Sequence, residues 1–241
     1  MVQGMQVRRT HDKLYLDENR YKNTKEIFKF IYSKAFSSEI ESDVEICDFG
    51  CAAGEFLYYL KAMRPKSRLT GFELLPELAE KAKAYVPDAE IITGSVLEKN
   101  HMTNDQFDIS FLIGVHSIFD EFQTCFENII NWTRPGGRVY IVGMFNPFPV
   151  DVWVKYRESK NIDDNSLESG WNIFSQETVS NYLRKNKRVI DHSFSPFEIS
   201  IDLPRQEDPV RSWTLRDYYD KRLIVNGLCL IQPHYVLEIL L

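Results

Sequence analysis

A glycine-rich turn directly after a short apolar run constrains the fold of this chain more than any other feature. The apolar run covers 44–49, and the turn reads Asp48-Phe49-Gly50-Cys51-Ala52-Ala53-Gly54. Gly50 permits a tight turn, and Gly54 permits the close approach of a helix or a ligand. Such a turn predicts the first strand and helix of an open α/β sheet, which binds its ligand beyond the carboxyl ends of the strands.

Strand-like and helix-like segments alternate after this turn. Strands are expected at 68–73, 90–92, 107–113 and 139–145, and helices at 55–63, 77–85 and 121–132. This alternation predicts a parallel sheet covered by helices on both faces. An earlier helix is expected after Asn23, with Glu26 as the reciprocal capping partner. The segment Arg134-Pro135-Gly136-Gly137 is expected to form a sharp turn before the fifth strand.

The pattern changes after Phe145, because Asn146-Pro147-Phe148-Pro149 interrupts the alternation. Ser175 is expected to cap a helix that runs to about Lys185. Segments 189–201 and 222–241 are strand-rich, and a polar stretch lies between them. The whole chain, 1–241, is expected to be one domain. Its parts are an N-terminal arm and helix (1–40), a ligand-binding core (41–145), and substrate-side and C-terminal strands (146–241).

Composition narrows the class of protein. The formal net charge is −6 and the pI is about 5.5, and the densest basic run, 184–188, is typical of a helix end. A dedicated nucleic-acid binder would carry an excess of basic residues, so no nucleic acid is expected as a partner. The four cysteines form no CxxC pair, and histidines and carboxylates do not cluster at metal-ligand spacing, so no metal is expected. No apolar run reaches bilayer length and no signal core opens the chain, which predicts a cytoplasmic protein without a membrane contact.

Two carboxylates limit the classes of ligand that the turn could bind. Glu73 ends the second expected strand, 19 residues after Gly54, where an acid accepts hydrogen bonds from ribose hydroxyls. That position fits a nucleoside ligand of any kind. Asp48 stands before the first glycine, where a carboxylate repels a pyrophosphate and attracts a sulfonium or ammonium group. Asp48 and the Pro-Gly-Gly turn therefore argue against a nicotinamide dehydrogenase, the alternative from another class.

These motifs, taken in order over roughly 40–145, resemble those of class I S-adenosylmethionine-dependent methyltransferases. The resemblance implies a Rossmann-like α/β fold with a seven-stranded sheet, mostly parallel, with an antiparallel C-terminal strand, helices on both faces and a small C-terminal insertion. It also implies that the turn holds the methionine part of the cofactor, that Glu73 binds the ribose and that Leu74 packs on the adenine. Ser95 stands where many members have an acid, and Ala52 replaces the more usual glycine. The cofactor-binding residues expected on this basis are Asp48, Gly50, Cys51, Ala52, Gly54, Glu73, Leu74, Ser95, Val96 and Ile113.

The acceptor has no fixed signature in such a family. His116 follows the fourth expected strand and is the predicted general base, because a histidine titrates near neutral pH. Asp120 either orients His116 or caps the next helix. The first hypothesis is methyl transfer from S-adenosylmethionine, which leaves S-adenosylhomocysteine, to oxygen or nitrogen of a small-molecule acceptor by a monomer or homodimer. The alternatives are a methyltransferase acting on RNA or protein, and a cofactor-binding module without catalysis.

Overall fold

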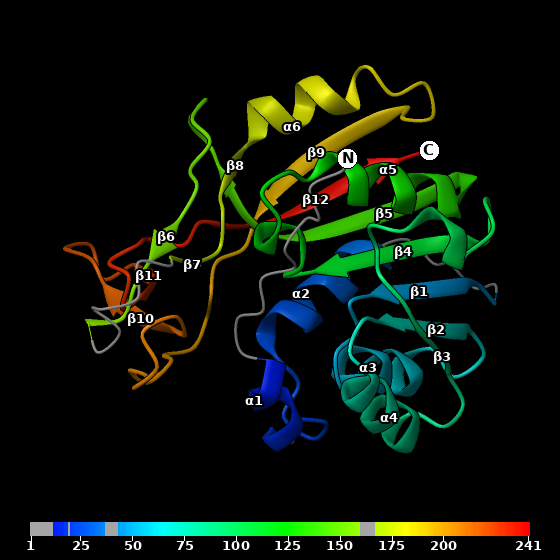
Figure 1. Cartoon of the computed structure of the whole chain (residues 1–241), viewed down its shortest axis with the longest axis horizontal. Helices are drawn as coiled ribbons and strands as arrows, with labels where there is room; N and C mark the ends of the chain where they lie inside the picture. Colours follow the sequence, from blue (N-terminus) through cyan, green and yellow to red (C-terminus); the bar gives the residue numbers. More distant parts are fainter. Residues whose placement is uncertain (1–11, 19, 37–42, 160–166) are drawn as a thin grey trace.

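Figure 1 shows the computed structural model of the chain, which describes residues 12–18, 20–36, 43–159 and 167–241. Its centre is a sheet whose strands follow the order β3-β2-β1-β4-β5-β12-β9, with the short β8 paired to β5. The strands are β1 (Glu45–Phe49), β2 (Arg68–Glu73), β3 (Glu90–Thr93), β4 (Phe107–Ile113), β5 (Thr133–Asn146), β8 (Phe174–Ser175), β9 (Asp191–Pro196) and β12 (His234–Leu240). Neighbours from β3 to β5 pair in parallel, whereas β12 is antiparallel to both β5 and β9. The predicted mostly parallel sheet with one antiparallel C-terminal strand is confirmed.

Helices cover both faces of this sheet, as the alternation predicted. One face packs against α2 (Glu26–Ala35), α3 (Glu55–Met63) and α4 (Pro76–Tyr85), and the other against α5 (Gln123–Trp132) and α6 (Gln176–Leu183). The first core joins Phe28 and Phe56 to Phe111. The second joins Phe126 and Val179 to the opposite face of the same strands.

The helix ends show which local predictions held. Ser175 Oγ accepts a hydrogen bond from Thr178 N at 3.0 Å and caps α6, as expected. The predicted cap at Asn23 is wrong, because α2 begins at Glu26 behind Lys25, and no side chain caps it. The Pro-Gly-Gly segment does end a helix, but its residues already belong to β5, and Gly136 adopts a φ of +79° there.

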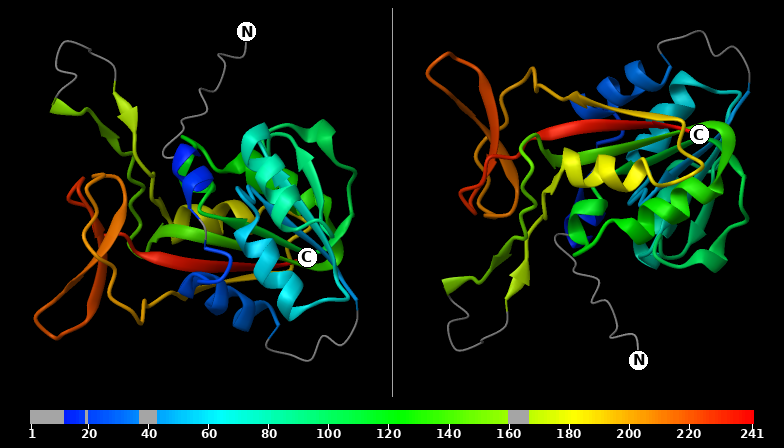
Figure 2. Two further views of the ribbon diagram at one scale, coloured as in Figure 1. Left: turned by 90° about the horizontal axis from the view of Figure 1, so that it is seen from below. Right: turned by 90° about the horizontal axis from the view of Figure 1, so that it is seen from above.

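Two hairpins project beyond the carboxyl ends of the parallel strands (Figure 2). They are formed by β6 (Lys155–Tyr156) with β7 (Glu168–Ser169), and by β10 (Ser212–Arg216) with β11 (Arg222–Asn226). The β10–β11 hairpin arises where the polar stretch between the strand-rich segments predicted an insertion, whereas the β6–β7 hairpin lies ahead of both segments and was not predicted. The remaining short elements are α1 (Asp12–Asp17), η1 (Lys99–His101) and η2 (His116–Ile118).

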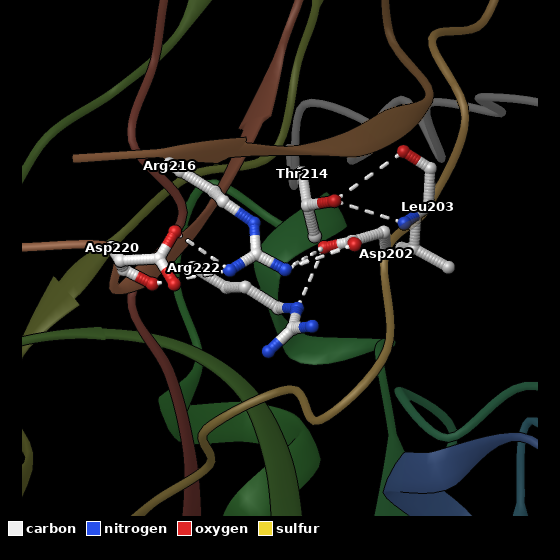
Figure 3. A network of polar contacts seen from close by, with 6 residues as sticks. All are labelled: Asp202, Leu203, Thr214, Arg216, Asp220 and Arg222. Carbon is white, nitrogen blue, oxygen red and sulfur yellow. Dashed lines mark hydrogen bonds and ion pairs between the residues drawn. The ribbon is translucent and has the colours of Figure 1, made fainter.

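Side chains fix the β10–β11 hairpin to the strand segment that precedes it (Figure 3). Asp202 accepts hydrogen bonds from both Arg216 and Arg222, and Arg216 also reaches Asp220. Leu203 N donates to the Thr214 hydroxyl at 2.9 Å. Exposed ion pairs contribute little one by one, but a shared carboxylate holds both strands of the hairpin in one register.

The N-terminal segment is fixed to the core by one lysine and one tyrosine. Lys81 Nζ on α4 donates to the backbone oxygens of Tyr15 and Leu16 in α1 and of Glu18 just after it. Tyr21 donates its hydroxyl to Ala53 O at 2.7 Å. This segment therefore lies over the glycine-rich turn; His11, expected in the same arm, lies outside the described residues. Among the residues described, no helix combines the length and the apolar character needed to cross a membrane.

Candidate active site

A cavity of about 350 Å³ opens at the carboxyl ends of the parallel strands. Two sets of residues line it. The core wall comes from the sheet domain between Asp48 and Phe119. The outer wall is formed by Tyr15, Lys25, Ile27, Phe28, Gly143, Met144, Trp171, Ser212, Gln232 and His234. This is the edge at which open α/β sheets bind their ligands, so the sheet topology itself places the site.

The glycine-rich turn forms the floor of the core wall. Gly50 and Gly54 have φ values of +75° and +79°, and Ala52 is also left-handed at +48°. A Cβ at Gly50 would stand 2.4 Å from Cγ2 of Val115, so a side chain cannot be accommodated there without movement. The amides of Gly50 and Cys51 both donate to Phe72 O, which fixes the turn to β2. Gly54 begins α3 and packs against Ala82 rather than lining the cavity.

Glu73 is oriented by backbone donors from two different loops. Its Oε2 accepts from Ala52 N and its Oε1 from Leu75 N, both at 2.9 Å. A carboxylate offers about four lone-pair sites, so these two donors do not exhaust its capacity to accept. The side chain is almost fully buried and lines the cavity. This geometry suits recognition of a pair of hydroxyls.

Asp48 is a buried carboxyl with an unsatisfied acceptor oxygen. Its Oδ1 has no hydrogen-bond partner within the described part of the chain, and only 2% of the residue is exposed. Burial, and then the nearby charge of Glu73, raise the pKa of Asp48 to about 8. A cationic ligand in the cavity would satisfy the oxygen and offset the repulsion between the two carboxylates. The donor set therefore fits a positively charged nucleoside such as S-adenosylmethionine.

Lys25 brings a cation to the outer wall, and sequence reasoning missed it. Its Nζ pairs with Glu55 at 2.9 Å and lies 5.3 Å from the ring centre of Tyr15. Burial is the largest influence on the pKa of Asp48 and raises it, whereas the charge of Lys25 lowers it. A lysine ahead of an expected helix is ordinary in a sequence, so only the folded arrangement shows that Lys25 faces this cavity.

The cavity brings together most of the residues predicted to bind the cofactor. Those that line it are Asp48, Gly50, Cys51, Ala52, Glu73, Leu74, Ser95, Val96 and Ile113. The Ser95 hydroxyl also accepts from Leu97 N at 3.2 Å, so it caps the turn that follows β3. The thiol of Cys51 has a pKa well above its usual range because of burial and the nearby Asp48, which leaves it without nucleophilic character at neutral pH.

His116 takes a different place from the one its predicted role requires. Its ring is fully buried and stacks on Phe145 with ring centres 4.6 Å apart, outside the residues that line the cavity. Burial lowers its pKa to about 4, so the ring is a weak base. The next residue, Ser117, lines the cavity instead. Asp120 does not orient His116 either, because it accepts from Lys155 and Asn172.

The outer wall also contains polar residues that the sequence did not single out. Ser212 donates its hydroxyl to Gln232 Oε1 at 2.5 Å, and the His234 ring hydrogen-bonds through Nδ1 to Gln232 O at 2.9 Å. Met144 and Trp171 line the same wall. These residues come from β5, the hairpin region and the start of β12, and no motif links them in the sequence.

An ion pair joins the two segments that form the outer wall. Glu18, which follows α1, binds Arg211 at 2.6 Å, and both side chains are largely buried. Glu18 also pairs with Arg20. Burial alone would raise the pKa of Glu18, but the hydrogen bond from Arg211 and the nearby cations bring it below its usual value. The N-terminal segment and the residue that precedes the β10–β11 hairpin are thus connected.

Comparisons with known proteins agree with this geometry. Residues 47–141 match the family model described as a methyltransferase domain. A chain in the complex of the Haloferax volcanii Trm112 methyltransferase activator with a putative methyltransferase is 15% identical, with a TM-score of 0.61 over 96% of this chain and 98% of that one. No curated protein matches the chain in sequence.

Two further solved structures share the fold. The N-methyltransferase NodS from Bradyrhizobium japonicum, in complex with S-adenosylhomocysteine, is 14% identical with a TM-score of 0.51, over 96% of this chain and 92% of that one. A SAM-dependent methyltransferase from Aquifex aeolicus is 12% identical with a TM-score of 0.52, over 96% and 100%. The described residues contain no group of three or more histidine, cysteine or acidic side chains placed to hold a metal. Residues 47–141 thus match a methyltransferase domain, and the sheet order and the cavity give the chain the fold of S-adenosylmethionine-dependent methyltransferases.

Proposed function

We propose that this protein is a methyltransferase that transfers the methyl group of S-adenosylmethionine to oxygen or nitrogen of a small-molecule acceptor. The observation that carries the proposal is the continuous cavity from Asp48 to His234, whose second wall is built by the N-terminal segment and the C-terminal strands. Its volume lies in the range of small-ligand pockets. The acidic net charge of −6 argues against an RNA acceptor.

In this proposal the core wall binds the cofactor. Asp48 faces the positive charge of the methionine part, and the turn of Gly50, Cys51 and Ala52 lies against the same part. Glu73 accepts from the ribose hydroxyls, and Leu74 packs on the adenine. Ser95, Val96 and Ile113 complete the cofactor site, while Gly54 allows α3 to approach. The product S-adenosylhomocysteine, which lacks the sulfonium charge, is expected to bind the same wall.

Methyl transfer requires the protein mainly to position the cofactor and the acceptor. The bound cofactor supplies an activated methyl group, and in-line displacement requires the acceptor atom to be held behind that carbon. An amine that arrives neutral needs no base, whereas a hydroxyl must lose its proton as the new bond forms. We propose that the outer wall holds the acceptor, and that the protein works as a monomer or homodimer with the arm, core and C-terminal strands serving one site.

Calorimetric titration with S-adenosylmethionine, with NAD as control, tests the cofactor site. Transfer of labelled methyl from the cofactor to pools of hydroxyl compounds, amines, RNA and protein then tests the acceptor. Label in the small-molecule pools alone supports the proposal. Label in RNA or protein alone would replace it with a macromolecular acceptor, and cofactor binding without transfer to any pool would favour a module without catalysis.

A further inference from the structure

His234 is the one histidine among the described residues that line the cavity. It opens β12 opposite Met144 of β5, so its position is set by the register of two central strands. Its side chain shares a sheet face with Val236, which packs in the core beneath α2 and α3. The residue His234 is partly exposed, whereas His116 is fully buried.

The hydrogen bond of His234 fixes which nitrogen carries the proton. Nδ1 lies 2.9 Å from the backbone oxygen of Gln232, and a carbonyl oxygen only accepts. Nδ1 must therefore donate, and the neutral ring keeps its lone pair on Nε2. Burial keeps the pKa of His234 below 6.5, so the ring is neutral at pH 7. An oriented, neutral imidazole is the form that a general base requires.

The outer wall around His234 favours an uncharged acceptor. Among its described residues Lys25 alone carries a formal charge, and Lys25 pairs with Glu55. The rest of that wall is apolar, aromatic or neutral polar, and includes the Gln232 carboxamide, whose Oε1 accepts from Ser212. A flat molecule with a hydroxyl fits such a surface better than a charged amine or a phosphate does.

We propose that His234 Nε2 is the general base of this enzyme, and that the acceptor is an uncharged molecule methylated on a hydroxyl oxygen. As that oxygen bonds to the methyl carbon, its O–H proton passes to Nε2. The carbon–sulfur bond breaks, and its electron pair stays on sulfur. The positive charge moves from the sulfonium to the imidazolium, and the products are the methyl ether and S-adenosylhomocysteine. This inference rests on the proposed function and names its acceptor class and its base.

Other titratable groups near His234 are few. Burial, and to a smaller extent the charge of His234, lower the pKa of His116 on η2 to about 4, so that ring stays neutral above pH 4. The Lys25–Glu55 pair faces the cavity from α2 and α3. Tyr15 lines it from α1, and Asp48 lies on the core wall. Because Asp48, with a pKa of about 8, also changes charge as the pH rises, the part of the pH dependence that disappears in His234→Asn is the part that reports on His234.

The test compares two phenols with the intact protein and S-adenosylmethionine. At pH 8 phenol keeps its proton, whereas 4-nitrophenol is largely ionised and needs no base. His234→Asn preserves a donor toward Gln232 O and removes Nε2. It should lower kcat for phenol by about 100-fold and change kcat for 4-nitrophenol by less than about threefold. The rise of phenol kcat/KM with pH below 6.5 should disappear in this variant.

His192→Asn is the matched control, because His192 lies on the neighbouring β9, bonds to Ser180 and does not line the cavity. It should leave both rates unchanged. Equal losses for the two phenols in His234→Asn, or an intact pH profile, would overturn the role of His234. Methylation of amines without any hydroxyl acceptor would overturn the acceptor class but leave the proposed function standing. If the wild-type protein did not bind S-adenosylmethionine, the proposed function itself would be refuted.

Discussion

The two walls of the cavity differ in how the chain builds them. The core wall is made by turns that directly follow consecutive strands, so neighbours in the site are close in sequence. The outer wall joins the segment around Tyr15 to residues beyond 143, which meet only after the sheet has closed. Backbone conformation dominates the first wall, and side-chain contacts between distant segments dominate the second. Substitutions should therefore disturb the two walls in different ways.

The largest effect is expected at the turn of the core wall. Gly50→Val should abolish calorimetric binding of S-adenosylmethionine, because a β-branched residue disfavours a φ of +75° and its Cβ would collide with Val115. Gly136→Val is the control, since Gly136 has a similar φ but a Cβ added there would meet no atom within 4 Å. The control should retain binding. Loss of binding in both variants would mean that general backbone strain, not the site, is responsible.

A smaller effect is expected at the carboxylate that bridges two loops. Glu73→Gln should weaken cofactor affinity by about 10- to 100-fold, because hydrogen bonds to a charged acceptor contribute about 1.5–3 kcal/mol. Glu77→Gln, on the exposed side of the first turn of α4, should leave affinity unchanged. Calorimetry measures both variants. Equal affinity for Glu73→Gln and wild type would remove the proposed ribose contact.

Asp48 links the core wall to pH. Its folded pKa of about 8 lies above the ordinary value of 3.8, so the folded protein binds this proton more tightly than the unfolded chain does. The contribution of Asp48 to stability is therefore present below pH 4 and is lost as the pH rises toward 8. Asp48→Asn should raise the melting temperature of the ligand-free protein by about 3–5 °C at pH 8 and by less at pH 5.

The exposed Asp88 supplies the control for this titration. Asp88→Asn, which removes a loose pair with Lys61, should shift the melting temperature little at either pH. If Asp48→Asn followed the wild-type dependence between pH 5 and 8, the carboxyl would be ionised throughout. That result would contradict the hypothesis that Asp48 is a buried, protonated carboxyl that becomes ionised when a cationic ligand binds.

The smallest effect is expected where the outer wall is joined. Glu18→Gln should speed hydrogen exchange in residues 12–18 while changing cofactor affinity by less than about twofold, because an ion pair near the surface contributes about 1 kcal/mol or less. Arg20→Gln leaves the pair of Glu18 with Arg211 in place and should have a weaker effect on exchange. A loss of cofactor affinity in Glu18→Gln as large as that in Glu73→Gln would remove the distinction between the walls.

The same contrast explains what the sequence alone predicts. The strands from β1 to β5, and the placement of Asp48 and Glu73 at strand ends, follow from periodicity and turn chemistry within short segments. His116 and Ser117 are adjacent after β4, and their order does not tell which side chain enters the core and which the cavity. His234 and Gln232 join the cavity through the register of β12 with β5, which is a long-range property. The cap at Asn23 was wrong because the packing of α2, not its capping chemistry, sets where that helix begins.

The position of β12 also determines when the central sheet can be completed during synthesis. β12 lies between β5 and β9 in the sheet, yet it is synthesised after both. Until it arrives, β5 presents an unpaired edge rich in buried apolar residues, and β9 has no neighbour. Pairings between such distant segments form slowly, and open edges promote association between chains. We therefore expect a chain that ends before residue 234 to associate with other chains through the open edge of β5.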